Sequence, residues 1–140
     1  MHEKKDRVIF DTNIWISYLI SDEFSFIDTL ILHHYFDLIY SEELLKEFVT
    51  VTKRKKFNRY FTTKEINSIV DWIIKFGIYI DVKSRINICR DPKDNFLLSL
   101  SYDAHATHLI SGDKDLLEIK YFYGTTILEY SSYIKNIIIL

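Results

Sequence analysis

The sequence predicts an α/β protein, a three-layer α/β/α sandwich built around a central parallel sheet of five strands. Short apolar runs alternate with longer segments of helical spacing, as they do when helices cross over between parallel strands. Aspartate-bearing stretches also stand where a strand-like run gives way to a helix-like pattern, and ligands bind at such junctions in parallel sheets. The 140 residues, 48% of them hydrophobic, suffice for one domain, which we expect to span residues 1–140.

The first half of the chain begins with a short buried strand. The apolar run Val8–Phe10 predicts this strand, and a helical pattern over 12–20 follows it directly. A second helix is predicted over 24–34, where apolar residues stand three and four positions apart, and a second strand over 37–40. Ser41 is the expected N-cap of a helix to about residue 55, in a partial capping box because Leu44 replaces the usual Glu or Gln.

The second half continues the alternation of helices and strands. A helix is predicted over 63–76, capped by Thr62 or Thr63 and ended by Gly77, with a third strand over 79–82. Asp91 is the expected N-cap of a helix that begins at Pro92 and runs to about residue 106. The remaining predicted elements are a strand over 108–110, a short helix over 113–117 and a strand over 126–128. A closing helix or a partly extended tail is expected over 130–138.

Composition limits the functions open to the chain. The net charge of −2 gives no positive field over the whole protein, so binding of nucleic acid depends on a local basic patch. The single cysteine, Cys89, excludes an internal disulfide framework and fits a reducing cytoplasm, which is the expected location. The charged start is unlike a signal peptide, and no apolar run approaches the roughly 20 residues of a membrane span.

Carboxylates are predicted to converge at the carboxyl edge of the sheet. Asp11, Asp94 and Asp113 stand at three junctions between strand-like and helix-like segments, and Asp115 follows two residues after the last of them. Each one singly also fits a capping role at a helix N-terminus. Because Ser or Thr would cap equally well, the repeated use of Asp indicates a requirement for charge. Carboxylates held together repel one another unless they share a cation, which predicts a metal site.

A fourth carboxylate is expected from the helix after the second strand. Glu47 borders the apolar stripe of that helix, which favours a place at the rim of the sheet, with a solvated flank as the alternative. A site of carboxylate oxygens suits the hard cation Mg²⁺. The five histidines show no spacing typical of metal ligands, which argues against zinc.

The order of these motifs resembles the PIN domain, and more narrowly the VapC-like ribonucleases that form the toxin component of toxin–antitoxin pairs. The motifs are Phe10-Asp11-Thr12-Asn13, Ser41-Glu42-Glu43-Leu44-Leu45-Lys46-Glu47-Phe48, Asp91-Pro92-Lys93-Asp94-Asn95 and Ser111-Gly112-Asp113-Lys114-Asp115-Leu116-Leu117. They span about residues 7–130, and their order is more specific than any one of them alone.

The resemblance implies an α/β/α sandwich, RNA cleavage that depends on Mg²⁺ or Mn²⁺, frequent homodimers and inhibition by a cognate antitoxin. The family's acidic positions fall on Asp11, Glu47, Asp94 and Asp113, with Asp115 as a further candidate ligand, and its polar helpers fall on Asn13 and Ser111.

The acidic positions predict a metal-dependent nuclease, and the resemblance implies that its substrate is RNA, which makes it an endoribonuclease. Asp11, Asp94 and Asp113 would hold one or two divalent ions, and Glu47 would complete the shell directly or through water. The metal would lower the pKa of a bound water and neutralise charge on the phosphoryl oxygens. Asn13 and Ser111 would orient water or phosphate. The dense basic cluster, Lys53, Arg54, Lys55 and Lys56, would contact RNA phosphates, although its charges also suit a helix C-terminus.

Two other functions fit parts of the sequence. A catalytically inactive PIN-like scaffold could dock a protein partner, but an unused cluster of like charges would destabilise the fold. A phosphatase of the haloacid dehalogenase type also has an Asp after its first strand. That chemistry uses a second Asp two residues later, where this chain has Asn13.

Overall fold

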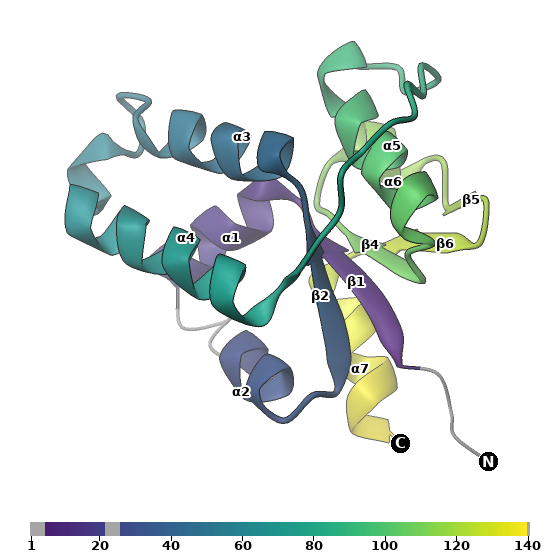
Figure 1. The fold of residues 1–140 in the computed structure, drawn as a ribbon, viewed down its shortest axis with the longest axis horizontal. Helices are drawn as coiled ribbons and strands as arrows, with labels where there is room; N and C mark the ends of the chain where they lie inside the picture. The colour runs from purple at the N-terminus through teal and green to yellow at the C-terminus, as the bar shows by residue number, and fades with distance from the viewer. Residues whose placement is uncertain (1–4, 22–25, 140) are drawn as a thin grey trace.

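A six-stranded, mostly parallel sheet flanked by helices forms the centre of the molecule (Figure 1). The computed structural model describes residues 5–21 and 26–139. The strands are β1 (Asp6–Phe10), β2 (Phe36–Tyr40), β3 (Ile78–Tyr79), β4 (His108–Ile110), β5 (Tyr121–Phe122) and β6 (Thr125–Leu128). They lie in the order β3-β2-β1-β4-β6-β5, and only β5 pairs antiparallel with its neighbour. The α/β class and the five parallel strands expected from the sequence are therefore confirmed.

The helices connect these strands and cover them. The α-helices are α1 (Thr12–Ile20), α2 (Phe26–Leu32), α3 (Glu42–Thr52), α4 (Thr63–Phe76), α5 (Asn95–Ala104), α6 (Lys114–Leu117) and α7 (Tyr130–Ile139). Two short 3-10 helices are η2 (Asn58–Tyr60) and η3 (Pro92–Asp94). The expected caps Ser41 and Asp91 both accept a hydrogen bond from a backbone N–H of the turn that follows them. At α4 the cap is Thr62, in a full capping box with Glu65.

Several predicted boundaries were wrong. The third strand was expected over 79–82 but is only Ile78–Tyr79, because the chain then leaves the sheet and packs along α5. α3 ends at Thr52 rather than at residue 55, and the predicted helix from Pro92 to 106 is divided into η3 and α5. The antiparallel strand β5 was not predicted. The predicted start of the second helix, residue 24, lies outside the described residues.

The central strands position the functional side chains. β1 lies between β2 and β4, with Val8 opposite both Leu38 and His108, and its last three residues are buried. Because β1 and β4 are parallel neighbours, the residues after their carboxyl ends lie at the same edge of the sheet. Those residues begin with Asp11 and Ser111. None of the described helices combines the length and apolar character that crossing a bilayer requires.

Candidate active site

Ser111 ties together the ends of β1 and β4. Asp11 follows β1, and its backbone N–H donates to the carbonyl of Ile110 at 2.9 Å. The Ser111 hydroxyl donates to Asp11 Oδ2 at 2.7 Å and accepts a 3.0 Å hydrogen bond from the backbone N–H of Asp113. The second carboxylate oxygen of Asp11 accepts from the backbone N–H of Asn13 at 3.4 Å. One buried hydroxyl thus fixes two of the predicted acidic positions relative to each other.

Asp113 and Asp115 enter the site from the first turn of α6. Asp113 is the N-cap of this helix, and its Oδ1 accepts from the backbone N–H of Asp115 at 2.8 Å. Asp115 also lies 3.5 Å from Nη1 of Arg90, whose other terminal nitrogen pairs with Glu118. This exposed guanidinium holds the Asp115 carboxylate at the margin of the site.

Asp94 is the buried centre of the acidic group. Asp91 caps η3 by accepting from the backbone N–H of Lys93, and Pro92 begins the turn, so that Asp94 stands at its end. Asp94 is 7% exposed, and its Oδ2 has no hydrogen-bond donor among the described residues. The neighbouring carboxylate of Asp113 can serve as its partner only when the two share a proton.

Burial and mutual repulsion raise the pKa values of two carboxylates. Burial is the main cause of the raised pKa of Asp11, and the charges of Asp113 and Glu47 add to it, while the hydrogen bond from Ser111 opposes it. Burial also raises the pKa of Asp94 to about 7, with further contributions from Asp113, Asp11 and Asp91. Each of these two side chains therefore lies close to several other carboxylates, and a bound cation would offset the repulsion between them.

One close group of carboxylate oxygens includes a residue that was not among the predicted ligands. Oxygens of Asp91, Asp94 and Asp115 all lie within 4.8 Å of one another. Asp91 was expected only as a helix cap, and the signal for a second role is its spacing: residues three apart in a 3-10 turn share a face. Asp11 and Asp113 approach Asp94 from beyond the ends of β1 and β4. The residues present fit a hard divalent cation, because an orphaned, buried carboxylate oxygen lies among oxygen donors.

The other residues predicted for the site lie around the acidic group and are less buried than Asp11 and Asp94. Glu47 is half-buried on α3 and close enough to contribute to the raised pKa of Asp11. Asn13 is exposed, and its backbone N–H makes the hydrogen bond to Asp11. Lys53, Arg54, Lys55 and Lys56 are all exposed and follow the end of α3.

The family model of the PIN domain matches residues 7–115, a range that includes Asp11, Glu47, Asp94, Asp113 and Asp115. The chain belongs to the PIN-domain family. Members of this family are nucleases, so this PIN domain falls among the hydrolases that act on nucleic acid.

This PIN domain is similar to one protein in sequence and to another in fold. It is 30% identical over 129 residues to the uncharacterized protein MJ1680 of Methanocaldococcus jannaschii, covering 86% of this chain and 79% of that protein. Among solved structures it matches a chain of VapBC2 from Rickettsia felis, crystallised with a DNA fragment from the promoter of these proteins. That match has a TM-score of 0.58 and 15% identity, and it covers 89% of this chain and 98% of the other. At this identity the match shows that the fold is shared.

Proposed function

We propose that this PIN domain is an endoribonuclease that depends on Mg²⁺ or Mn²⁺ and that acts as the toxin of a toxin–antitoxin pair. The observation that carries the proposal is the buried Asp94 carboxylate, which has an oxygen without a donor among the described residues and a pKa of about 7 among other carboxylates. A folded protein gains nothing from such a group unless a cation or a proton neutralises it. In a family of nucleases, a cation bound at this carboxylate would assist the cleavage of a phosphodiester bond.

The residues that would hold the cation are Asp11, Asp94 and Asp113, with Asp91, Asp115 and Glu47 around them. Ser111 favours the ionised form of Asp11 through its hydrogen bond, and it aligns that carboxylate with the start of α6. Asp94 must release its proton before it binds a cation, because a metal ligand is the ionised carboxylate. The bound cation would supply an acidified water and would neutralise charge on the phosphoryl group.

The remaining polar groups would hold the substrate. The exposed side chain of Asn13 is available to orient water or a phosphate oxygen at the rim. Lys53, Arg54, Lys55 and Lys56 follow directly after α3, whose last residue, Thr52, lies roughly 7.5 Å along the helix axis from Glu47. A strand whose scissile phosphate lies at the acids would therefore have neighbouring phosphates within reach of these cations.

The toxin assignment rests on two independent likenesses. The motif order resembles VapC-like toxins, and the fold matches a chain of VapBC2. We therefore propose an RNA substrate, a cognate antitoxin as protein partner, a homodimer as the assembled state and the cytoplasm as the location. Growth arrest on expression, relieved by the product of a flanking reading frame, would support this part of the proposal. Normal growth on expression of soluble protein would contradict it.

The catalytic part is tested by cleavage of a mixed single-stranded RNA with Mg²⁺ or Mn²⁺. Asp11→Asn and Asp94→Asn should each abolish cleavage, whereas Asp71→Asn, at an exposed position on α4, should leave it unchanged. Undiminished cleavage by both site variants would refute the assignment. Thermal unfolding with and without Mn²⁺ distinguishes the nuclease from an inactive scaffold. Mn²⁺ should raise the Tm of the nuclease, because a ligand that binds the folded state stabilises it, and should leave the Tm of a scaffold unchanged.

A further inference from the structure

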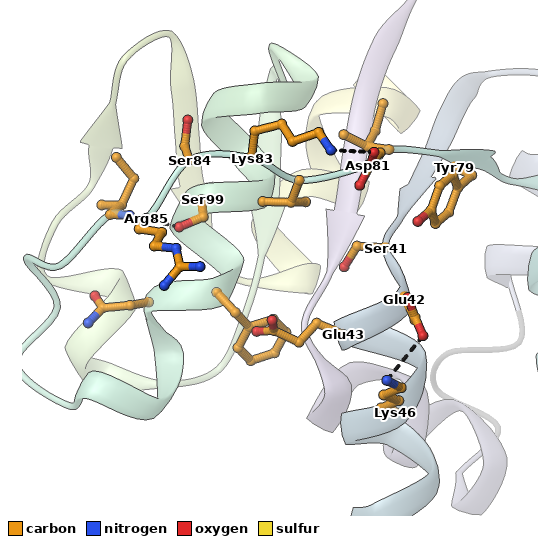
Figure 2. Close-up of a pocket in the computed structure, with 15 residues that line it drawn as sticks. Ser41, Glu42, Glu43, Lys46, Tyr79, Asp81, Lys83, Ser84, Arg85 and Ser99 are labelled. Atoms are coloured by element: carbon orange, nitrogen blue, oxygen red, sulfur yellow. Dashed lines mark hydrogen bonds and ion pairs between the residues drawn. The ribbon is translucent and has the colours of Figure 1, made fainter.

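A polar cavity of about 630 Å³ lies beside the acidic group (Figure 2). It is bounded by the first turn of α3, by the extended stretch 79–86 after β3 and by the first turns of α5. Its charged lining residues are Glu42, Glu43, Lys46, Asp81, Lys83 and Arg85, and the aromatic ring of Phe96 also lines it. Its volume falls within the ~300–1,000 Å³ that is usual for small-molecule sites.

One wall of this cavity is held rigidly by α5. Asn95, Ser99 and Asp103 stand four residues apart on one face of that helix. Asp103 accepts from the backbone N–H groups of Lys83 and Ser84, at 2.6 and 2.9 Å. Ser99 Oγ accepts from the N–H of Ile86 and Asn95 Oδ1 from that of Cys89, both at 2.9 Å. A stretch that lies outside the sheet is thereby fixed along the helix.

The fixed stretch presents alternate side chains to solvent. Asp81, Lys83, Arg85 and Asn87 are exposed, whereas the residues between them are half-buried, as expected for an extended backbone. The position of Arg85 is thus set by the main-chain hydrogen bonds on either side of it, at Ser84 and Ile86.

Two charges in the cavity have no ionic partner among the described residues. Lys46 pairs with Glu42 at 3.0 Å and Lys83 pairs with Asp81 at 2.8 Å, so these four charges cancel in pairs. Glu43 and Arg85 form no ion pair within residues 5–21 and 26–139. Figure 2 shows them pointing toward one another, Glu43 from α3 and Arg85 from the fixed stretch. One carboxylate acceptor and one guanidinium donor are therefore available to a ligand between them.

The cavity continues the acidic site along the same edge of the sheet. Asn95 and Phe96 follow Asp94 directly, and Glu43 lies one helical turn before Glu47. Ser41 follows β2 and Tyr79 ends β3, so the cavity lies over the carboxyl ends of these strands as the acids lie over those of β1 and β4. Phe96, half-buried at the cavity wall, offers a ring on which a base can stack.

We propose that this cavity is a guanine-binding subsite for a nucleotide of the RNA strand close to the scissile phosphate. Guanine presents O6 and N7 as acceptors to an arginine fork, and its N1–H and N2 amino groups as donors to a carboxylate. Arg85 and Glu43 supply this pair of complements from opposite walls. The base must be unpaired to enter, so the substrate is single-stranded. This inference deepens the proposed function and rests on it.

The test measures binding separately from cleavage. Fluorescence anisotropy with the full chain in EDTA follows labelled uridine octanucleotides that carry a single guanosine, and guanosine at one register should raise the affinity about tenfold over uridine. Inosine lacks the N2 amino group, and 7-deazaguanosine lacks N7. Inosine should weaken binding to the wild type but not to Glu43→Gln. 7-Deazaguanosine should weaken binding to the wild type but not to Arg85→Ala. Both residues are exposed, so the variants should fold.

Matched controls come from the paired charges of the same cavity. Glu42→Gln and Lys83→Ala should keep both analogue penalties. Equal affinity for all bases, preference for a base other than guanine, or penalties that persist in both site variants would each overturn the subsite. Sequencing of cut ends from a random RNA then separates the two proposals. Efficient cleavage with no guanosine preference would support the nuclease proposal and contradict the guanine subsite. Guanosine-dependent binding without cleavage would support the subsite and contradict the nuclease proposal.

Discussion

The Ser111 hydroxyl and the Asp11 carboxylate lie 2.7 Å apart although 100 positions separate them in the chain. This hydrogen bond joins the carboxyl ends of two adjacent parallel strands inside the acidic site. It is also the main interaction that opposes the effect of burial on the pKa of Asp11. A buried serine thus acts on the charge of its neighbour as well as on its position.

Ser111→Ala should therefore weaken the binding of divalent cations. Without the hydroxyl, the hydrogen bond that lowers the pKa of Asp11 is lost, so the ionised carboxylate, which is the form that binds a cation, is less favoured. We expect a loss of about 1 kcal/mol in stability and a weaker Mn²⁺-induced rise in Tm. Ser101→Ala is the control, since this buried serine donates to the Leu97 carbonyl within α5. An unchanged Mn²⁺ response in Ser111→Ala would contradict the role given to the hydroxyl.

Asp94→Asn should stabilise the metal-free protein at alkaline pH. The pKa of Asp94 is about 7 in the folded chain against 3.8 ordinarily, so the folded state holds the proton more tightly. The stability from this group is fully present below pH 3.8 and is lost as the pH rises through about 7. The variant should thus gain on the order of 1–2 kcal/mol at pH 8 in EDTA, by thermal or urea unfolding.

The control variant for this measurement, Asp103→Asn, should change the stability in the opposite direction. Asp103 lies on α5, which begins directly after Asp94. Burial tends to raise the pKa of Asp103, but the hydrogen bonds that it accepts from Ser84 and Lys83 outweigh this effect and lower it. Asp103→Asn should therefore lose stability at neutral pH. With saturating Mn²⁺ the wild type should regain stability and Asp94→Asn should not. A less stable Asp94→Asn in EDTA at pH 8 would contradict the account of a strained, metal-free cluster.

The acidic positions were predictable because a single sequence shows where an apolar strand-like run gives way to a helix-like pattern. Asp11 follows three apolar residues directly, and Asp113 comes three positions after the apolar pair Leu109–Ile110. Parallel strands bring these ends to one edge of the sheet. The proximity of Asp91 to these acids was not predictable in the same way. A cap and a metal ligand use the same residue type, and only the folded chain reveals that its carboxylate lies near those of Asp94 and Asp115.

The missed strand has an equally physical reason. β5 and β6 form a hairpin whose two loop residues, Tyr123 and Gly124, have φ values of 45° and 89°. Two-residue hairpins require such positive φ angles, and Asn-Gly or Asp-Gly is their usual signal. A Tyr-Gly pair after a two-residue strand gives almost no such signal. The cavity beside the acids was also invisible, because its wall depends on hydrogen bonds from α5 to a stretch outside the sheet.

Gly77→Ala should destabilise the fold even though its φ of −90° suits any residue. A Cβ at this position would lie 2.6 Å from the Ile73 carbonyl oxygen and 2.7 Å from the Tyr40 ring. The clash with the backbone cannot relax cheaply, so we expect a loss of about 1–3 kcal/mol by urea unfolding. Gly112→Ala is the matched control, because a Cβ there meets nothing within 4 Å. Equal stability of the two variants would contradict the prediction.

Lys53→Ala with Lys55→Ala should weaken RNA binding and flatten its dependence on salt. If both side chains neutralise phosphates of a single strand, the slope of log affinity against log salt should become shallower by roughly 0.7 for each lysine removed. Lys64→Ala with Lys75→Ala removes the same charge from α4 and should leave the slope unchanged. The measurement is anisotropy across a salt series. An unaltered slope in the first pair would show that these lysines serve only the end of α3.

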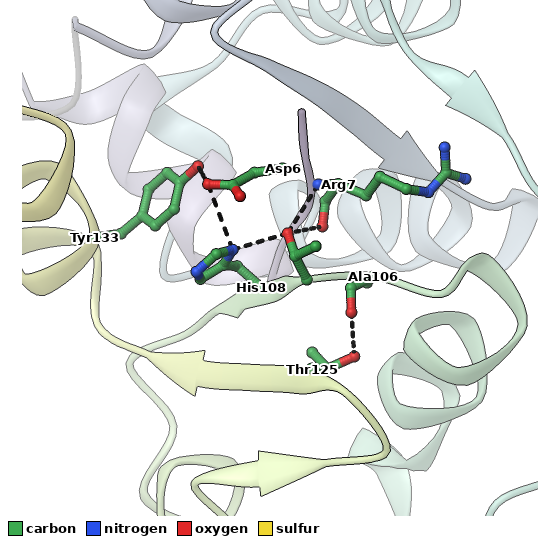
Figure 3. Close-up of polar contacts among 7 residues, drawn as sticks. Asp6, Arg7, Ala106, His108, Thr125 and Tyr133 are labelled. Atoms are coloured by element: carbon green, nitrogen blue, oxygen red, sulfur yellow. Dashed lines mark hydrogen bonds and ion pairs between the residues drawn. The ribbon is translucent and has the colours of Figure 1, made fainter. Parts of the chain in front are cut away.

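Tyr133 attaches α7 to the sheet through contacts with Asp6 and His108 (Figure 3). The hydroxyl of Tyr133, which is 1% exposed, donates to Asp6 Oδ2 at 2.8 Å, and its ring packs 4.8 Å from that of His108. His108 Nδ1 lies 3.7 Å from the same Asp6 oxygen and 2.9 Å from Thr107 Oγ1. Burial lowers the pKa of His108 below 6.5, while the charge of Asp6 opposes this effect.

Because the folded pKa of His108 is the lower one, the unfolded chain binds its proton first. The stability from this group is present above pH 6.5 and is lost as the pH falls through the folded pKa. Comparison with His108→Asn across about pH 4.5–8 should therefore show a steeper acid decline in the wild type. Tyr133→Phe keeps the ring and should cost about 1 kcal/mol at alkaline pH without removing that decline. Parallel pH profiles for the wild type and His108→Asn would exclude the imidazole as the group that titrates.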